Sequence, residues 1–221
     1  MVPELFESIE QWRRGRRHDS RRDTAATSRV VIAVSGICLL FALRAAAQDA
    51  SYQLDPASTS VKFTLGDVLH TVHGTFKLKH GELQLQPAGK ISGEIVVDAA
   101  SGNSGSAMRD RKMHKEVLES TKYPEIDFRP DRFDGSVADR GKSSVMVHGR
   151  FSINGAEREI TVPAQVEMDA DHWTANVHFT IPYAKWGMKN PSTLFLRVSD
   201  TVTIDLETGG SVNRTAAISN Q

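Results

Sequence analysis

The sequence is poor in cysteine, because Cys38 is the only one among 221 residues. A single cysteine excludes a disulfide within the chain, so burial of apolar side chains and backbone pairing must stabilise the fold. The sequence also lacks an excess of charge of either sign, since 27 Lys and Arg balance 27 Asp and Glu. This balance gives no support for a nucleic-acid partner or for an anionic membrane surface.

Long hydrophobic runs are scarce too, and the one present is Val30–Leu43. It is shorter than the roughly 20 apolar residues that a membrane-spanning helix needs. Arginines precede it, and Ala45–Ala47 follows as an A-x-A cleavage pattern before Gln48. We therefore predict that residues 1–47 are a signal peptide, and that the remaining chain, which has no thiol, is periplasmic or secreted. A core helix and an uncleaved membrane anchor are the alternative interpretations.

Signatures of catalysis are missing as well, since no G-x-S-x-G nucleophile elbow occurs. A metal site usually needs three or four converging ligands. His70 and His73 are expected on opposite faces of a strand, and His148 and His178 fall at outward positions of theirs. The sequence therefore predicts neither an enzyme nor a metal or other cofactor.

What the sequence does contain is the alternation of apolar and polar residues that is typical of strands. Eight or nine such segments follow residue 52, and Asn154–Gly155 is a strong hairpin turn signal. His80–Gly81 is predicted to be a further turn. Pro163 lacks a backbone donor, so its strand should be bulged or at an edge there. A closed barrel and a two-sheet sandwich both fit this pattern, and Gly209 onward (209–221) is predicted to be a mobile tail.

The alternation changes once after the N-terminal region, between Ala107 and Ser120. There Met113, Val117 and Leu118 are spaced as on one face of a helix. A single amphipathic helix among many strands is predicted to cover the interior that the strands enclose, as a lid.

Three stretches carry a family resemblance: VHGTFK at Val72–Lys77, RDRKMHKEVLESTKYPEIDF at Arg109–Phe128, and HGRFSINGAEREITVPAQVE at His148–Glu167. In their order and spacing the chain resembles the YceI-like family of exported, lipocalin-like proteins. The resemblance implies an all-β fold, a lipocalin-like antiparallel barrel of about eight strands over residues 48–208 with one inserted helix after the fourth strand. It also implies a tunnel for a long apolar isoprenoid lipid, such as a quinone or polyprenyl chain, and a possible homodimer. Residues 182–196 depart from the family pattern, which leaves the length and headgroup of the ligand open.

The candidate ligand contacts are the inward-facing side chains, each of which could instead be plain core packing. They are Phe63, Phe76, Ile95, Phe128, Val147, Phe151, Val162, Phe179 and Ile204 on the strands, with Met113, Val117 and Leu118 on the helix. Arg109 and Asp110 are the candidate headgroup contacts at the tunnel mouth. Their alternative role is structural, with Asp110 favouring the helix dipole and Arg109 pairing with it or with a loop carbonyl.

Three functions remain open at this point. The leading hypothesis is an exported carrier or reservoir for an isoprenoid lipid, because each buried methylene contributes about 0.8 kcal/mol and such a site needs no catalytic signature. A structural β-sandwich that makes protein contacts would have a filled interior. A lipid-modifying enzyme would carry a polar group of perturbed pKa inside the cavity.

Overall fold

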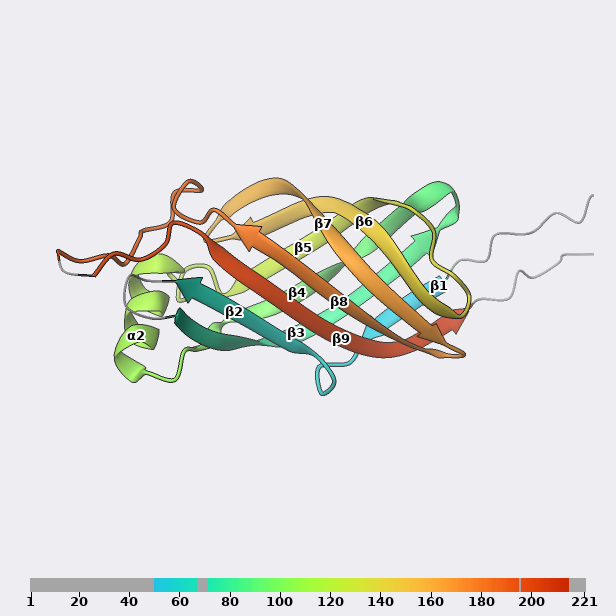
Figure 1. Ribbon diagram of the computed structural model, residues 1–221, viewed down its shortest axis with the longest axis horizontal. Coiled ribbons are helices and arrows are strands. Elements are labelled where there is room, and N and C mark those ends of the chain that lie inside the picture. The colour runs from blue at the N-terminus through green and yellow to red at the C-terminus, as the bar shows by residue number, and fades with distance from the viewer. Residues whose placement is uncertain (1–49, 67–70, 195, 215–221) are drawn as a thin grey trace, which may run out of the picture. The chain divides into compact units, whose positions relative to one another are not determined.

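The computed structural model describes residues 50–66, 71–194 and 196–214 (Figure 1). The predicted signal peptide and residues 215–221 of the predicted tail lie outside these ranges. Within them the chain forms nine strands: β1 (Ala50–Leu54), β2 (Ser60–Gly66), β3 (Thr71–Gln86), β4 (Lys90–Asn103), β5 (Glu125–Asp134), β6 (Gly141–Ile153), β7 (Ala156–Asp169), β8 (His172–Ile181) and β9 (Val202–Arg214).

The strands close into an antiparallel barrel with eight positions around its wall. Strands β1 and β2 share one position between β3 and β9, because β1 pairs with the end of β3 and β2 with its beginning. The β3–β4 pairing closes the circle. The structure therefore confirms the predicted all-β barrel and excludes the two-sheet sandwich. Closure also leaves apolar faces pointing inward along every strand.

Residues His80 and Gly81, predicted to form a turn, lie inside the long strand β3. Leu78 pairs with Val97 and His80 pairs with Val96, so β3 has one extra residue at this point. Such a β-bulge interrupts the alternation without ending the strand. The prediction of a turn was wrong because a bulge and a turn disturb the apolar pattern in the same way. The real turn between β3 and β4 is the 3-10 helix η1 (Pro87–Gly89).

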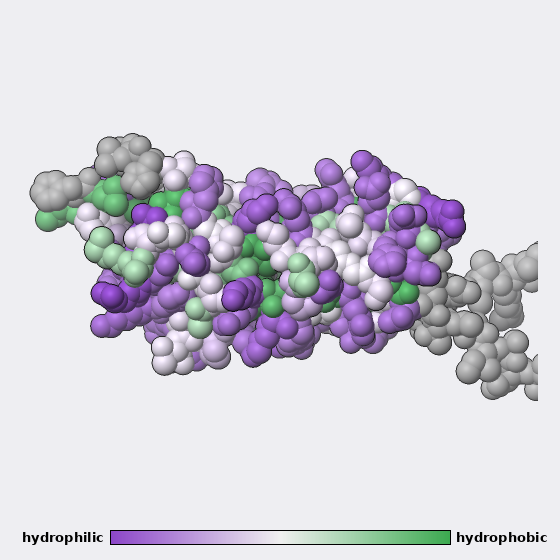
Figure 2. Space-filling view, turned by 90° about the horizontal axis from the view of Figure 1, so that it is seen from below, coloured by the Kyte–Doolittle hydropathy of each residue, from purple (hydrophilic) through white to green (hydrophobic). Residues whose placement is uncertain are grey.

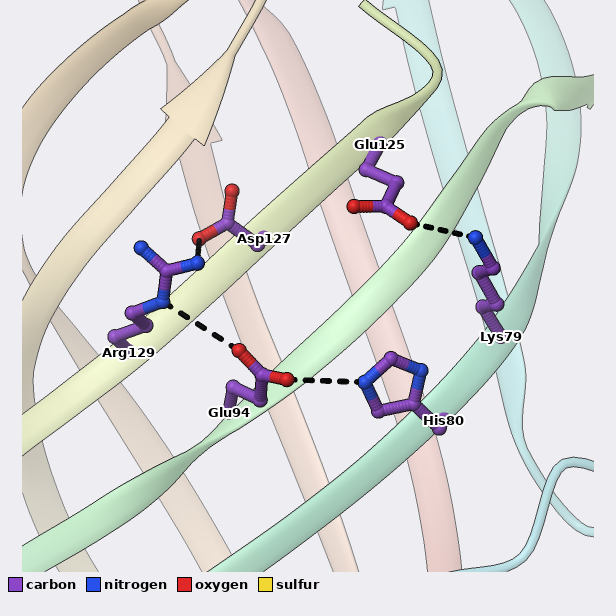
Figure 3. A network of polar contacts seen from close by, with 6 residues as sticks. All are labelled: Lys79, His80, Glu94, Glu125, Asp127 and Arg129. Carbon is purple, nitrogen blue, oxygen red and sulfur yellow. Dashed lines mark hydrogen bonds and ion pairs between the residues drawn. The ribbon is translucent and has the colours of Figure 1, made fainter.

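The bulge also places Lys79 and His80 together on the outer face of the barrel. Here six side chains from β3, β4 and β5 form a polar network (Figure 3): Lys79, His80, Glu94, Glu125, Asp127 and Arg129. Glu94 lies at its centre, with His80 Nε2 at 3.1 Å from one carboxylate oxygen and Arg129 Nε at 3.5 Å from the other. The hydrogen bond to His80 is the main cause that lowers the pKa of Glu94.

The last strand corrects the predicted tail, because β9 continues through residues 209–214. Gly210 pairs with Leu54 of β1 and Trp173 of β8, and Val212 is buried. A Cβ added at Gly210 would lie only 1.8 Å from the backbone oxygen of Gln53. Glycine at this position therefore permits a close approach of two strands, rather than marking a mobile segment.

The predicted helix has two parts, the α-helix α2 (Ala107–Lys112) and the π-helical turn η2 (Met113–Val117). The helical segment ends at Val117 instead of the predicted Ser120, and Leu118 donates its N–H to the Met113 carbonyl at 2.9 Å. Glu119 then adopts a positive φ of 47°, which terminates the helix. Nowhere in the described ranges is there a helix long and apolar enough to cross a membrane.

Two apolar clusters fill parts of the barrel. One contains buried residues of β1, β3, β7, β8 and β9: Tyr52, Leu54, Leu78, Met168, Trp173, Ala175 and Val212. The other contains buried residues of β6 and β8, of the end of the helical segment, and of the excursion between β8 and β9. They are Leu118, Phe151, Ile153, Ile181, Tyr183 and Met188. Figure 1 shows the helical segment and this excursion at the same end of the barrel, opposite the β3–β4 turn.

Candidate functional site: an apolar cavity in the barrel

The barrel encloses a cavity of about 550 Å³. All nine strands, the helical segment and the β8–β9 excursion contribute side chains to its wall. The volume falls within the range of about 300–1,000 Å³ that is typical of small-molecule sites. Apolar residues dominate the wall, so the cavity suits an apolar molecule.

The exposure of the inward-facing residues indicates whether the interior of the barrel is hollow or packed. Phe63, Phe151 and Val162 are buried, as expected of core residues. Six others keep partial exposure although their side chains line the cavity: Phe76, Ile95, Phe128, Val147, Phe179 and Ile204. An apolar side chain that faces the inside of a closed barrel retains such exposure where it borders open space. These six residues therefore border the space in which a ligand could lie.

Thirteen of the fourteen predicted site residues line this cavity. They are Phe63, Phe76, Ile95, Arg109, Met113, Val117, Leu118, Phe128, Val147, Phe151, Val162, Phe179 and Ile204. The helix thus contributes the three residues that its spacing indicated. The structure brings these side chains together because the period of two assigns one face of every strand to the interior.

Asp110 is the exception, since it is absent from the cavity wall. Its carboxylate accepts hydrogen bonds from the backbone N–H of Ser104 at 2.7 Å and from the Ser104 hydroxyl at 2.6 Å. Burial alone raises the pKa of Asp110, but the bonds from Ser104 outweigh it and hold that pKa below its ordinary value. Asp110 therefore fixes the turn between β4 and α2, which is a structural role, and its contact with a ligand headgroup stays a prediction.

Arg109 has both a structural and a cavity-facing role. Its Nη2 donates to the Ser104 carbonyl at 2.9 Å, which is the loop-carbonyl contact considered from the sequence. Arg109 also lines the cavity, together with the neighbouring Met108 and Lys112. Lys112 Nζ donates to the Pro191 carbonyl at 2.8 Å and so joins the helical segment to the β8–β9 excursion. These two elements bound the mouth of the cavity.

The β8–β9 excursion is the part of the site that sequence reasoning missed. Six of its residues line the cavity: Tyr183, Met188, Pro191, Thr193, Leu196 and Val198. Trp186 packs against Phe151, with ring centroids 6.0 Å apart. The signal was present as apolar and aromatic residues at 183, 186 and 188, but their spacing fits neither a strand nor a regular helix.

Polar chemistry inside the cavity is limited in the described residues. Burial raises the pKa of Tyr183 to about 12, with a smaller contribution from Asp200, and the Tyr183 hydroxyl donates to the Ser199 carbonyl at 2.6 Å. This group stays protonated near neutral pH and is already hydrogen-bonded. Across the described ranges no three His, Cys, Asp or Glu side chains gather as a metal site would require. The arrangement is suited to holding a molecule by burial.

A closed antiparallel barrel with an apolar cavity and a helix at its mouth is the architecture of lipocalin-like proteins. The model of the YceI-like domain family matches residues 52–209. The chain therefore belongs to the YceI-like family, as its sequence motifs indicated.

Known proteins are similar to this chain in sequence or in fold. The chain is 26% identical over 146 residues to the UPF0312 protein VPA0850 of Vibrio parahaemolyticus, covering 63% of this chain and 75% of the relative. Its fold is similar to that of BcnA from Burkholderia cenocepacia, with a TM-score of 0.61 and 19% identity, covering 72% of this chain and 99% of BcnA. It is also similar to a polyisoprenoid binding domain from Saccharophagus degradans, with a TM-score of 0.60 and 18% identity, covering 73% and 98%.

Proposed function

We propose that this chain is an exported protein that holds a long apolar isoprenoid-type lipid, such as a quinone or polyprenyl chain, in the barrel cavity. It would serve as a carrier or reservoir rather than as an enzyme. The observation that carries the proposal is the hollow apolar interior of about 550 Å³. The description of the Saccharophagus degradans domain as polyisoprenoid binding supports the choice of ligand class.

Burial of methyl and methylene groups supplies the affinity in this proposal. Each buried CH₂ contributes about 0.8 kcal/mol, so a few isoprene units give tight binding with little polar help. Arg109 lines the cavity, and in this proposal its guanidinium contacts the polar headgroup. Export rests on the apolar run Val30–Leu43 and the alanines before Gln48, which lie outside the described residues. A homodimer stays a prediction from the family resemblance.

The direct test is organic extraction of the purified protein followed by mass spectrometry. We expect a co-purifying long-chain lipid, and an intact protein mass that corresponds to a chain beginning at Gln48. Replacing the cavity residue Val147 with Trp should reduce the lipid bound per protein, because the indole would occupy part of the ligand volume. Met146→Trp is the matched control, since Met146 is the exposed neighbour on β6.

Absence of lipid from the wild-type extract, together with no uptake of an added polyprenol, would contradict the proposal. Equal lipid retention in the Val147→Trp and wild-type proteins would place the ligand elsewhere. A chain that keeps residues 1–47 in the exported fraction would contradict the signal peptide but not the lipid site.

A lipid-modifying reaction finds less support than binding. Asp110 is engaged with Ser104, and His114 contacts the Gly102 carbonyl at 2.9 Å and the Ser120 hydroxyl at 3.3 Å. These groups hold the connection between β4 and β5 together. If a reaction nevertheless occurred at the mouth, replacing Asp110 and His114 with Ala would abolish turnover of the extracted lipid.

A further inference from the structure

Exposed apolar side chains are concentrated at the cavity mouth. Three large apolar residues are exposed among the described part of the chain, and two of them are Met108, 76% exposed, and Leu194, 96% exposed. Met108 lines the cavity from α2, and Leu194 follows the cavity residue Thr193. The third, Met146, lies on β6 and is only 40% exposed. Large apolar side chains in water at the opening of a site indicate a surface that contacts something else.

We call this surface the mouth end and define it as residues 104–120, 182–194 and 196–200. The hydrogen bond from Lys112 to Pro191 and the 2.6 Å ion pair between Lys189 and Glu116 hold its two segments together. Figure 2 shows hydrophobic residues gathered at this end of the barrel, while hydrophilic residues cover much of the visible wall.

The mouth end also has a net positive charge, whereas the rest of the described chain has a net negative one. Its sequence has seven Lys and Arg against four Asp and Glu, whereas the remaining described residues have twelve against sixteen. Three of its four acidic residues have polar partners: Asp110 binds Ser104, Glu116 binds Lys189, and Asp200 accepts a hydrogen bond from Asn190 at 2.7 Å. The near-balanced charge of the whole chain conceals this difference between the mouth end and the rest.

We propose that the mouth end docks on an anionic phospholipid bilayer, with Met108 and Leu194 entering the interface. Apolar side chains bordered by basic ones are the pattern that binds such interfaces, because burial of the first adds to the attraction of the second for anionic lipids. Docking in this orientation brings the cavity opening against the bilayer. An apolar ligand then passes between membrane and cavity without crossing water. This contact goes beyond the proposed binding function and is tested separately from it.

Local insertion is measured with an environment-sensitive NBD label on the full-length chain. Cys38→Ser removes the native thiol, and Leu194→Cys and Met146→Cys each provide one labelling position. Vesicles contain brominated phosphatidylcholine, with or without phosphatidylglycerol. We expect the label at 194 to shift to the blue and to be quenched in the anionic vesicles, while the label at 146 remains unchanged. The N-terminal apolar run is the same in both proteins, and each label senses only its own surroundings.

The charge contribution is tested by removing two exposed cations of the mouth end, Arg111→Gln with Lys115→Gln. Each basic side chain near an anionic surface contributes about fivefold in partitioning, so the expected loss in quenching-derived affinity is roughly 25-fold. The matched control is Arg140→Gln with Lys142→Gln, which removes two exposed cations at the β5–β6 connection, at the other end of the barrel, and should have little effect. High salt should weaken insertion at position 194 in the wild-type background.

Equal quenching at positions 194 and 146, or equal losses in the two charge variants, would overturn the docking surface. A blue shift at 194 that depends on protein concentration without vesicles would assign this surface to a second copy of the chain and also overturn it. Lipid extraction separates this result from the proposed function. If the protein retains lipid but does not insert into vesicles, only the docking proposal is contradicted. If it inserts but binds no lipid, only the proposed cavity function is contradicted.

Discussion

Tyr183 is the residue whose ionisation is most strongly coupled to the fold at the cavity wall. It is only 4% exposed, its hydroxyl donates to Ser199, and burial raises its pKa to about 12 from the ordinary value of 10. A group that binds its proton more tightly in the folded state stabilises that state below its unfolded pKa. This contribution is lost as the pH rises from about 10 to 12.

We therefore predict that the wild-type protein loses stability through this alkaline range faster than Tyr183→Phe does. At neutral pH the variant should be less stable by about 1 kcal/mol, because the hydrogen bond to Ser199 is removed. Urea unfolding of both proteins at a series of pH values measures the difference. Parallel stability curves between pH 10 and 12 would show that Tyr183 does not titrate with the fold.

At the scale of elements, the predicted role of the helical segment as a lid can be tested directly. Met113 and Leu118 both line the cavity. Leu118 belongs to the second apolar cluster and Met113 packs against it, while Lys115 is exposed on the same turn. If these apolar side chains close over the ligand, their truncation opens a route to solvent and shortens the time for which the lipid is held.

We predict that Met113→Ala and Leu118→Ala lower the amount of lipid that co-purifies by severalfold. Leu118→Ala also removes a buried side chain and should cost about 2–5 kcal/mol of stability. Leu78→Ala is a matched control, because Leu78 is equally buried but does not line the cavity. Mass spectrometry of the bound lipid, with thermal melts of each variant, separates retention from stability. Unchanged retention in both helix variants would show that the helix is not a lid.

The strands and most of the cavity wall could be predicted from the sequence because alternation determines which side chains face inward. Pro163 behaved as its missing donor suggested, since β7 pairs with β8 only from Ala164 onward. The bulge at His80 and the close strand contact at Gly210 could not be predicted in the same way. Both depend on neighbouring strands that are distant in the sequence, and glycine there resembles a turn or a tail.

The polar part of the site was harder to predict for a related reason. The sequence shows that a carboxylate is present but not which hydrogen-bond donor it will contact. Asp110 accepts a hydrogen bond from Ser104 and does not line the cavity. The excursion that supplies Tyr183 and Met188 has no regular period, so no single face could be assigned to it. Its position became visible only through contacts such as that between Trp186 and Phe151.

At the scale of the whole molecule, the hollow interior couples ligand occupancy to stability. Six inward-facing apolar residues keep partial exposure at the cavity wall, and a bound chain would cover them. A ligand that binds only the folded state adds about 2.7 kcal/mol at a concentration 100 times its dissociation constant.

We predict that delipidated protein melts at a lower temperature than the same protein reloaded with an extracted lipid. For a domain of this size the difference should be roughly 5–10 °C at 100-fold saturation. Differential scanning calorimetry measures both states, and the Val147→Trp variant should gain less on reloading. Identical melting of loaded and delipidated wild-type protein would place the lipid outside the folded barrel.

The shared wall position of β1 and β2 has a consequence for how the protein is made. Both strands pair with β9, and Ala50 lies opposite Arg214, so the first and last described strands are direct neighbours. Until β9 is available, β1, β2 and β8 each lack one of the two strands with which they pair, and the apolar interior stays open to water. Contacts of such large sequence separation form slowly and leave unpaired edges exposed to aggregation in the meantime. The barrel thus depends on the final part of its own synthesis, and a nascent chain that lacks β9 needs protection until the last strand closes the wall.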